Sequence, residues 1–162
     1  MKIQSLLDRV EKGILFALSI IFFVMVASIF SQIVMRFIFH NANSWSEELT
    51  RYTFVWLTLL GASVAVRRGR HMKVDFFIDM IPKNIAKAFK ILTNILILGF
   101  FLVVIKYGID LVGITYKQLS AGLEIPMAYA YLAIPVGGIF MLIFTIESYF
   151  IKDTNNNSVE ED

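Results

Sequence analysis

The sequence predicts an all-α integral membrane protein with four transmembrane helices. Two long stretches, Gly13 to Met35 and Ile125 to Ile146, contain no charged side chain. A helix needs about 20 apolar residues to cross the hydrocarbon core of a bilayer. Seven Lys and Arg residues fall between Arg67 and Lys90, with only two Asp residues among them. Because Lys and Arg accumulate on cytoplasmic loops, this segment indicates the orientation of the spans.

The composition narrows the class of protein further. The chain has 162 residues, of which 57% are hydrophobic. We expect one transmembrane domain over residues 1–151 and a disordered, polar and acidic tail over residues 152–162. The absence of cysteine excludes disulfides, thiolate metal sites and a cysteine nucleophile. The net charge of +2 with basic residues beside spans indicates contact with the lipid bilayer and no nucleic-acid partner.

The first two predicted spans lie in the N-terminal part of the chain. The first predicted span runs from Gly13 to about Phe39. It is retained rather than cleaved, because its apolar run exceeds the roughly 7–15 residues of a signal-peptide core. The second predicted span runs from Trp45 to Val66. Ser44 and Glu47 fit a capping box, in which two side chains satisfy the free amides of a helix start.

Two further apolar stretches predict the third and fourth spans. The third predicted span centres on Ile91 to Ile105 and continues toward Lys117. The fourth runs from Ile125 to about Phe150, and Pro135 inside it predicts a kink. Small residues allow close approach of helices in membranes. We therefore expect helix packing at Gly61, Ala65, Pro135, Gly137 and Gly138.

Basic residues place both termini on one side. Lys2, Arg9 and Lys12 precede the first span, and the outer connections carry few basic residues. Both termini and the segment 67–90 are therefore expected in the cytoplasm. Val74, Ile78 and Ile81 in that segment recur at helical spacing, which predicts a short amphipathic stretch lying in the membrane interface. An ordinary polar loop is the alternative.

The polar residues within the spans are mostly hydroxyls. We expect them to bond their own backbone or to pack between helices. No charge is expected near mid-membrane, and Glu147 is the deepest acidic residue of the fourth span, near its cytosolic end. We expect no catalytic residue, no metal and no cofactor. His40 and His71 lie on opposite sides of the predicted membrane, which excludes haem held by a histidine pair.

A charged group marks the start of the second span. Arg51 is four residues from Glu47 and three from Glu48, so a local ion pair is available to it. One interpretation is a helix cap with a surface ion pair of small energetic value. The other is that the two acids and the base, beside Trp45, lock a helix or dock a partner protein.

The ordered residues of this region resemble a known family. Trp45-x-Glu47-Glu48-x-x-Arg51 is followed by Trp56, Gly61-Ala62, Arg67, Gly69, His71 and Val74-Asp75. This pattern resembles the small membrane subunit, of DctQ type, of tripartite ATP-independent periplasmic (TRAP) transporters. Tyr131 and Pro135 also fit, whereas Met127-Ala128 departs from the large aromatic expected there. The resemblance implies structural or partner-docking roles for Trp45, Glu47, Glu48, Arg51, Trp56, Arg67, Gly69, His71 and Asp75.

The resemblance implies a three-part uptake system in the bacterial inner membrane. A soluble periplasmic protein binds an organic acid, and a large membrane subunit carries it inward with a sodium gradient. The small subunit supports the large one, and its outer loops help to dock the binding protein. The chain is then no carrier by itself.

Two alternatives from other classes stay open. One is a self-sufficient small exporter acting as a dimer, which usually requires a buried acidic residue within a span. The other is an unrelated membrane assembly subunit. The sequence leaves the organic acid open among C4-dicarboxylates, sialic acid and other carboxylates.

Overall fold

The computed structural model describes residues 2–40, 44–69 and 83–157, which are mostly helical. The helices are α1 (Lys2–Phe37), α2 (Ser44–Arg68), α4 (Lys83–Thr115), α5 (Ala128–Tyr131) and α6 (Ala133–Asn157). Four candidate spans are long and apolar enough to cross a membrane, within α1, α2, α4 and the combined α5 and α6. This result confirms the prediction of four transmembrane helices.

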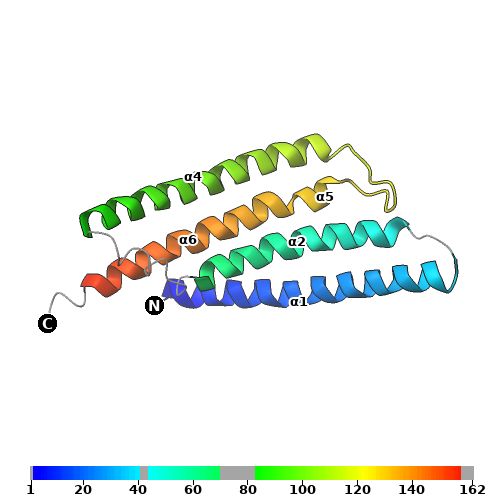
Figure 1. The fold of residues 1–162 in the computed structure, drawn as a ribbon, viewed down its shortest axis with the longest axis horizontal. Helices are drawn as coiled ribbons and strands as arrows, with labels where there is room; N and C mark the ends of the chain where they lie inside the picture. The colour runs from blue at the N-terminus through cyan, green and yellow to red at the C-terminus, as the bar shows by residue number, and fades with distance from the viewer. Residues whose placement is uncertain (1, 41–43, 70–82, 158–162) are drawn as a thin grey trace.

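The four spans stand side by side in a single row (Figure 1). Helix α1 packs against α2, α2 packs against α6, and α6 packs against α4. The short helix α5 leads into α6 and contacts both α2 and α4. The fourth span is therefore inserted between the second and the third, and α1 and α4 form the two edges of the row.

The two ends of the row differ in what they contain. One end holds the start of α1, the end of α2, the start of α4 and the end of α6 (Figure 1). We call it the inner end. The opposite end holds the start of α2 and the connection between α4 and α5, and we call it the outer end.

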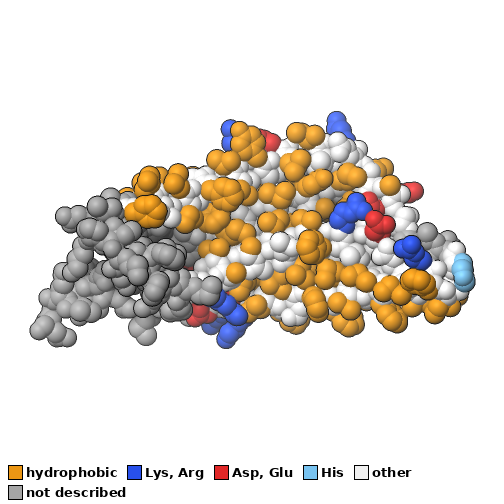
Figure 2. Space-filling model, in the orientation of Figure 1, with side chains coloured by type: hydrophobic (Ala, Val, Ile, Leu, Met, Phe, Trp, Pro, Cys, Tyr) orange, Lys and Arg blue, Asp and Glu red, His pale blue; other side chains and the backbone are white. Residues whose placement is uncertain are grey.

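The row has only a small internal core. Ile14, Leu60, Val64 and Phe144 form a buried cluster that joins α1, α2 and α6. Many large hydrophobic side chains face outward instead, and Phe23 of α1 is 74% exposed. Figure 2 shows one such face, covered mostly by hydrophobic side chains. Lipid or neighbouring transmembrane helices must cover this surface, because exposure of so much apolar area to water is unfavourable.

The helix bounds agree with the predicted spans, with three extensions. Helix α4 begins at Lys83, before Ile91. Helix α1 begins at Lys2, well before Gly13. Helix α6 continues to Asn157, into the segment predicted to be disordered, because extending an existing helix is far easier than starting one. Residues 158–162 lie outside the described residues. A single turn residue, Leu132, separates α5 from α6 and lies three residues before Pro135, where the kink is predicted.

Hydroxyl side chains in the spans mainly bond their own helix. Ser19 donates to the Leu15 carbonyl, and Thr145 donates to the Met141 carbonyl. Thr53, Thr58 and Thr93 make the same bond to the residue four positions earlier. The expected role of these hydroxyls is confirmed.

Candidate functional site

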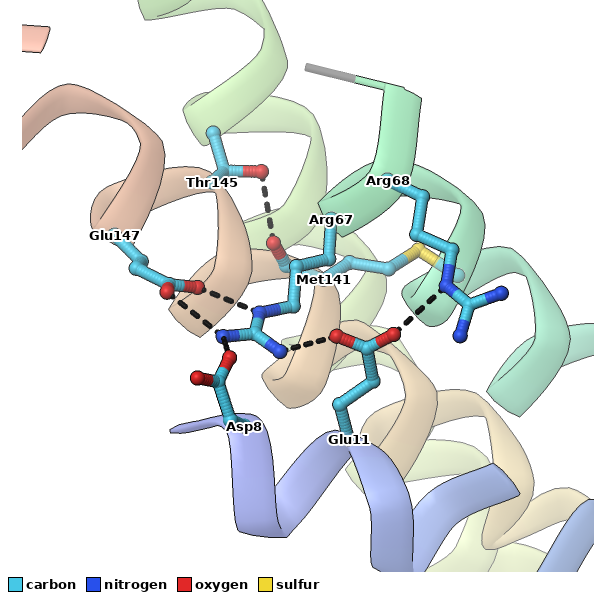
Figure 3. A network of polar contacts seen from close by, with 7 residues as sticks. All are labelled: Asp8, Glu11, Arg67, Arg68, Met141, Thr145 and Glu147. Atoms are coloured by element: carbon cyan, nitrogen blue, oxygen red, sulfur yellow. Dashed lines mark hydrogen bonds and ion pairs between the residues drawn. The ribbon is translucent and has the colours of Figure 1, made fainter. Parts of the chain in front are cut away.

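At the inner end, the guanidinium of Arg67 on α2 lies among carboxylates from two other helices (Figure 3). Its Nε and Nη2 donate to the two oxygens of Glu147 on α6, each at 2.9 Å. Nη2 also donates to Asp8 on α1 at 2.6 Å, and Nη1 donates to Glu11 on α1. We call Asp8, Glu11, Arg67, Arg68 and Glu147 the inner ion cluster.

The centre of the inner ion cluster is buried. The side chains of Arg67 and Glu147 are 6% and 4% exposed. Buried charges are costly unless they are paired, and the planar guanidinium matches a carboxylate with two parallel hydrogen bonds. The Arg67 guanidinium also lies over the Phe144 ring, 5.3 Å from its centroid. At the rim, the exposed Arg68 donates to Glu11 at 2.7 Å. The cluster therefore fastens α1, α2 and α6 together at one level.

The sequence identified only part of this cluster. Arg67 was a predicted site residue, and Glu147 was expected near the cytosolic end of its span. The pairing of these two, and the contribution of Asp8 and Glu11, were missed. The signal was available, because all four residues fall on the same predicted side of the membrane, and Asp8 and Glu11 are one helical turn apart.

At the outer end, Glu48 holds the connection between α4 and α5. Its Oε2 accepts hydrogen bonds from the backbone amides of Gly122 and Leu123, each at 2.8 Å. We call these three residues the outer clasp. A side chain at position 122 has no room, because an added Cβ would lie 2.9 Å from both Glu48 Oε2 and the Ser44 carbonyl oxygen.

The clasped segment is itself an ordered hairpin. The amide of Met127 donates to the Gln118 carbonyl at 2.9 Å, and the amide of Ser120 donates to the Ile125 carbonyl at 2.9 Å. Glu124 adopts a positive φ of 54°, which closes the turn. The segment 118–127 is thus fixed both by its own bonds and by α2.

Arg51 pairs with Glu47 and not with Glu48. The distance from Arg51 Nη2 to Glu47 Oε1 is 3.0 Å, and both side chains are exposed. Glu48 is buried instead, and the hairpin amides donate to its carboxylate. A Glu48–Arg51 pair is therefore contradicted, since only Glu47 shares the exposed face with Arg51. Trp45 also lies on the surface, at 41% exposure.

Trp56 connects α2 to the break in the fourth span. Its Nε1 donates to the carbonyl oxygen of Tyr129 in α5 at 2.9 Å. This bond joins α2 to the short helix that leads into α6. Pro135 lies one turn further along the chain and is buried against α4, since an added Cβ at Gly108 would lie 2.9 Å from Pro135 Cδ.

Two predicted packing glycines lie within the row. An added Cβ at Gly137 would lie 2.9 Å from Leu59 Cβ of α2, and one at Gly138 would lie 2.9 Å from Ile105 Cγ1 of α4. These glycines therefore set the spacing between α6 and its two neighbours.

Two other residues that were predicted to pack, Gly61 and Ala65, are more open. An added Cβ at Gly61 meets no atom within 4 Å, and Ala65 is exposed. Gly61 lines a shallow apolar groove between α1 and α2, together with Leu15, Leu18, Ser19, Phe22 and Leu57. Of the four small residues, Gly61 and Ala65 remain available for contact outside the chain.

The contacts of Gly137 and Gly138 also show which residues of α2 and α4 lie at the same level along the row. Because Leu59 and Ile105 flank neighbouring positions of α6, they lie at about the same level. Lys106 follows Ile105 and is exposed. Lys106 is therefore level with Leu59.

Leu59 lies between the two polar ends of the row. Glu48 and Arg67 are ~28 Å apart along α2 at 1.5 Å per residue, which matches the ~30 Å hydrocarbon core. Lys106, level with Leu59, is therefore close to mid-depth. The prediction of no charge near mid-membrane is wrong, because the apolar run Ile91–Ile105 ends at the middle of the row and not near its outer surface.

The remaining predicted site residues lie beyond α2. Gly69 is the last described residue there and is exposed. His71, Asp75 and the predicted amphipathic stretch lie outside the described residues. Within the described ranges 2–40, 44–69 and 83–157, no group of three or more His, Cys, Asp or Glu residues is arranged to hold a metal ion.

Comparison with known proteins places the chain in a family. The family described as "Tripartite ATP-independent periplasmic transporters, DctQ component" matches residues 25–153. The chain is 30% identical to the sialic acid TRAP transporter small permease protein SiaQ of Vibrio cholerae, over 74% of this chain and 69% of that protein. It is 28% identical to a putative TRAP transporter small permease protein of Haemophilus influenzae, over 98% of this chain and 93% of that protein.

One relative is much longer than this chain. The sialic acid TRAP transporter permease protein SiaT of Haemophilus influenzae is 31% identical over 75% of this chain, and the match spans only 20% of SiaT. A sequence of this kind is therefore also present within a larger permease. The family match and the four spans agree on a transporter component, not an enzyme, with several spans in the bacterial inner membrane. The chain belongs to the DctQ family of TRAP transporter small permease subunits.

Proposed function

We propose that this chain supports the large membrane subunit of a TRAP transporter during sodium-driven uptake of an organic acid. The large subunit carries the solute, and a periplasmic binding protein delivers it. The match to a fifth of a longer permease supports close association with a larger membrane partner. The sialic acid permeases among the relatives favour a carboxylate as the substrate.

The single-row arrangement carries this proposal. A carrier requires a shielded polar site near the midplane, usually between repeats or broken helices. In this row each span packs against its immediate neighbours, so both broad faces are outer surfaces. Over residues 2–40, 44–69 and 83–157, such a row offers a large apolar area to a membrane partner. The transport pathway therefore belongs to the large subunit.

The outer end supplies a surface for the binding protein. The outer clasp and the hairpin bonds hold the segment 118–127 in one conformation. A preorganised loop costs less entropy on binding than a flexible one. We infer that this hairpin, with the exposed Glu47–Arg51 pair beside it, helps to dock the periplasmic binding protein.

Docking at the outer end requires that end to face the periplasm. The basic residues before the first span and after the second favour a cytoplasmic inner end. The chain contains no cysteine, so single cysteines can report the orientation. In intact cells, a membrane-impermeant thiol reagent should label Lys117→Cys and leave Lys12→Cys unlabelled. The opposite pattern would reverse the orientation.

The proposed function is tested by removing this chain from cells that contain the other two components. Uptake of the carboxylate that the binding protein recognises should fall to background, although the large subunit and the binding protein are present. A plasmid copy of the chain should restore uptake. Unchanged uptake without the chain would contradict a supporting role.

A further inference from the structure

Two charged side chains occupy the free edge of the row. Helix α4 faces α6 through Phe101 and Gly108, which are buried. Lys106 and Asp110 lie on the opposite side of α4 and are exposed. Figure 2 shows basic and acidic side chains interrupting the hydrophobic surface along the α4 edge. Among the described elements, the main packing partners of α4 are α5 and α6, which lie on its other side.

These charges belong to a regular seam along the helix. The seam residues are separated alternately by four and three positions, and all of them are exposed: Leu92, Leu96, Gly99, Val103, Lys106, Asp110 and Gly113. This is the spacing by which one helix packs lengthwise against another. Added Cβ atoms at Gly99 and Gly113 would meet open space, so a neighbouring backbone can approach closely there.

The charges on this seam require a partner. Lys106 lies near mid-depth, where an ionisable side chain facing hydrocarbon is costly. No ion pair joins Lys106 to Asp110 or to any other residue within the described ranges 2–40, 44–69 and 83–157. Lys106 Nζ instead lies 5.5 Å from the centroid of the Tyr107 ring. Lipid chains cannot satisfy either charge.

We propose that the α4 seam binds a transmembrane helix of the large subunit, which presents a carboxylate opposite Lys106 and a hydrogen-bond donor or cation opposite Asp110. This inference rests on the proposed function and adds to it the surface and the charge pattern of the contact. The apolar inner half of the seam, with Leu92, Leu96 and Val103, packs against apolar side chains of the same helix.

A second copy of this chain fits the seam poorly. Two copies in one membrane share an orientation, so their α4 helices would pack in parallel. In a parallel, in-register seam each position faces its own counterpart. Lys106 would then face Lys106 and Asp110 would face Asp110, and like charges at this depth repel strongly. The charge pattern favours a different helix with complementary charges.

Charge reversal tests the contact. The chain is tagged and co-expressed with its large subunit, and the amount of large subunit retained on the tagged chain is measured after detergent extraction. Lys106→Glu should lower retention at least about tenfold, because both it and the facing carboxylate are then left unpaired. Lys106→Arg should retain binding. The matched control is Lys117→Glu, an exposed lysine beyond the end of α4, which should leave retention within about twofold.

Two further measurements distinguish loss of the contact from misfolding of the Lys106→Glu variant. Isolated Lys106→Glu should unfold at the wild-type temperature in detergent. In the otherwise wild-type chain, p-benzoylphenylalanine in place of Val103 should cross-link to the large subunit. Retention of the large subunit by Lys106→Glu, or cross-links only to a second copy or to lipid, would overturn the proposal. Uptake by the wild-type transporter tests the supporting role separately, so either idea can fail alone.

Discussion

The inner and outer ends of the row are fastened by different chemistry. At the inner end, Arg67 satisfies carboxylates from α1 and α6, so three helices depend on one guanidinium. At the outer end, Glu48 accepts from two backbone amides of a hairpin. The first arrangement balances charge against charge, and the second places one charge on neutral donors. The inner end is therefore more vulnerable to loss of a single residue.

The two ends also differ in the range of sequence that they join. The inner ion cluster combines residues near the start of the chain, in the middle and near the end of the last span. The outer clasp fixes one connection to the start of α2. The inner end thus fixes α1, α2 and α6 relative to one another, whereas the outer end defines the conformation of a surface. The following changes separate these two roles.

Loss of Arg67 should have the largest effect. Arg67→Met removes the two Arg67 bonds of the buried Glu147 carboxylate and leaves Glu11 with Arg68. We expect the free energy of unfolding to fall by about 3 kcal/mol. Thermal unfolding in detergent, followed by tryptophan fluorescence, measures it. Arg68→Met is the matched control and should cost under about 1 kcal/mol, since Arg68 is exposed. Equal losses for the two variants would show that the cluster does not depend on Arg67.

Between the two ends, the spacing of helices should depend on Gly137. Gly137→Ala places a methyl group 2.9 Å from Leu59 Cβ, so α2 and α6 must separate. Overpacking of this kind costs about 1–3 kcal/mol. Gly61→Ala meets no atom within 4 Å and should leave the unfolding temperature unchanged or slightly higher. A stable Gly137→Ala variant would mean that the two helices are not in close contact there.

Loss of charge at the outer clasp should have a moderate effect. Glu48→Gln keeps an acceptor oxygen for the amides of Gly122 and Leu123 but removes the charge. We expect a cost of about 1 kcal/mol, because hydrogen bonds to charged groups are stronger than neutral ones. Hydrogen exchange of these two amides should accelerate, while exchange around Arg67 stays slow. Glu47→Gln is the control. Faster exchange at both ends would indicate that the ends are not independent.

The surface pair beside the clasp should contribute least. Arg51→Ala removes an exposed pair with Glu47 and should change stability by less than about 0.5 kcal/mol. The double variant in which Glu48 and Arg51 are exchanged should support no more uptake than the worse of the two single reversals. The reason is that these two residues do not pair. Any effect of Arg51→Ala on uptake should then appear as weaker affinity for the binding protein, measured with the assembled transporter. A stability loss as large as that of Glu48→Gln would contradict the surface assignment.

The spans could be predicted because each is a local property of the sequence. The apolar run from Gly13 and the proline at position 135 predict a helix and a kink without knowledge of neighbours. The order of helices in the row could not be predicted, since it depends on contacts such as that of Gly137 with Leu59. The depth of Lys106 follows from the same contacts and was therefore misjudged.

In the candidate site, too, contacts within one helix could be predicted from the sequence, whereas contacts between distant segments could not. Glu47 and Arg51 are one turn apart on a single helix, and their pair was available to sequence reasoning. Glu48 was identified as important, but its partners are backbone amides that any residue type can supply. The partners of Arg67 are distant in the sequence, and only the fold selects them from the acids on the inner side.

Reconstitution tests most directly whether this row of helices supports transport without performing it. Liposomes would contain this chain, the large subunit or both, with the binding protein and its carboxylate outside and an inward sodium gradient. Sodium-dependent accumulation should require both membrane subunits and the binding protein together. Accumulation by liposomes that contain this chain alone would contradict the supporting role and would make the chain a carrier in its own right.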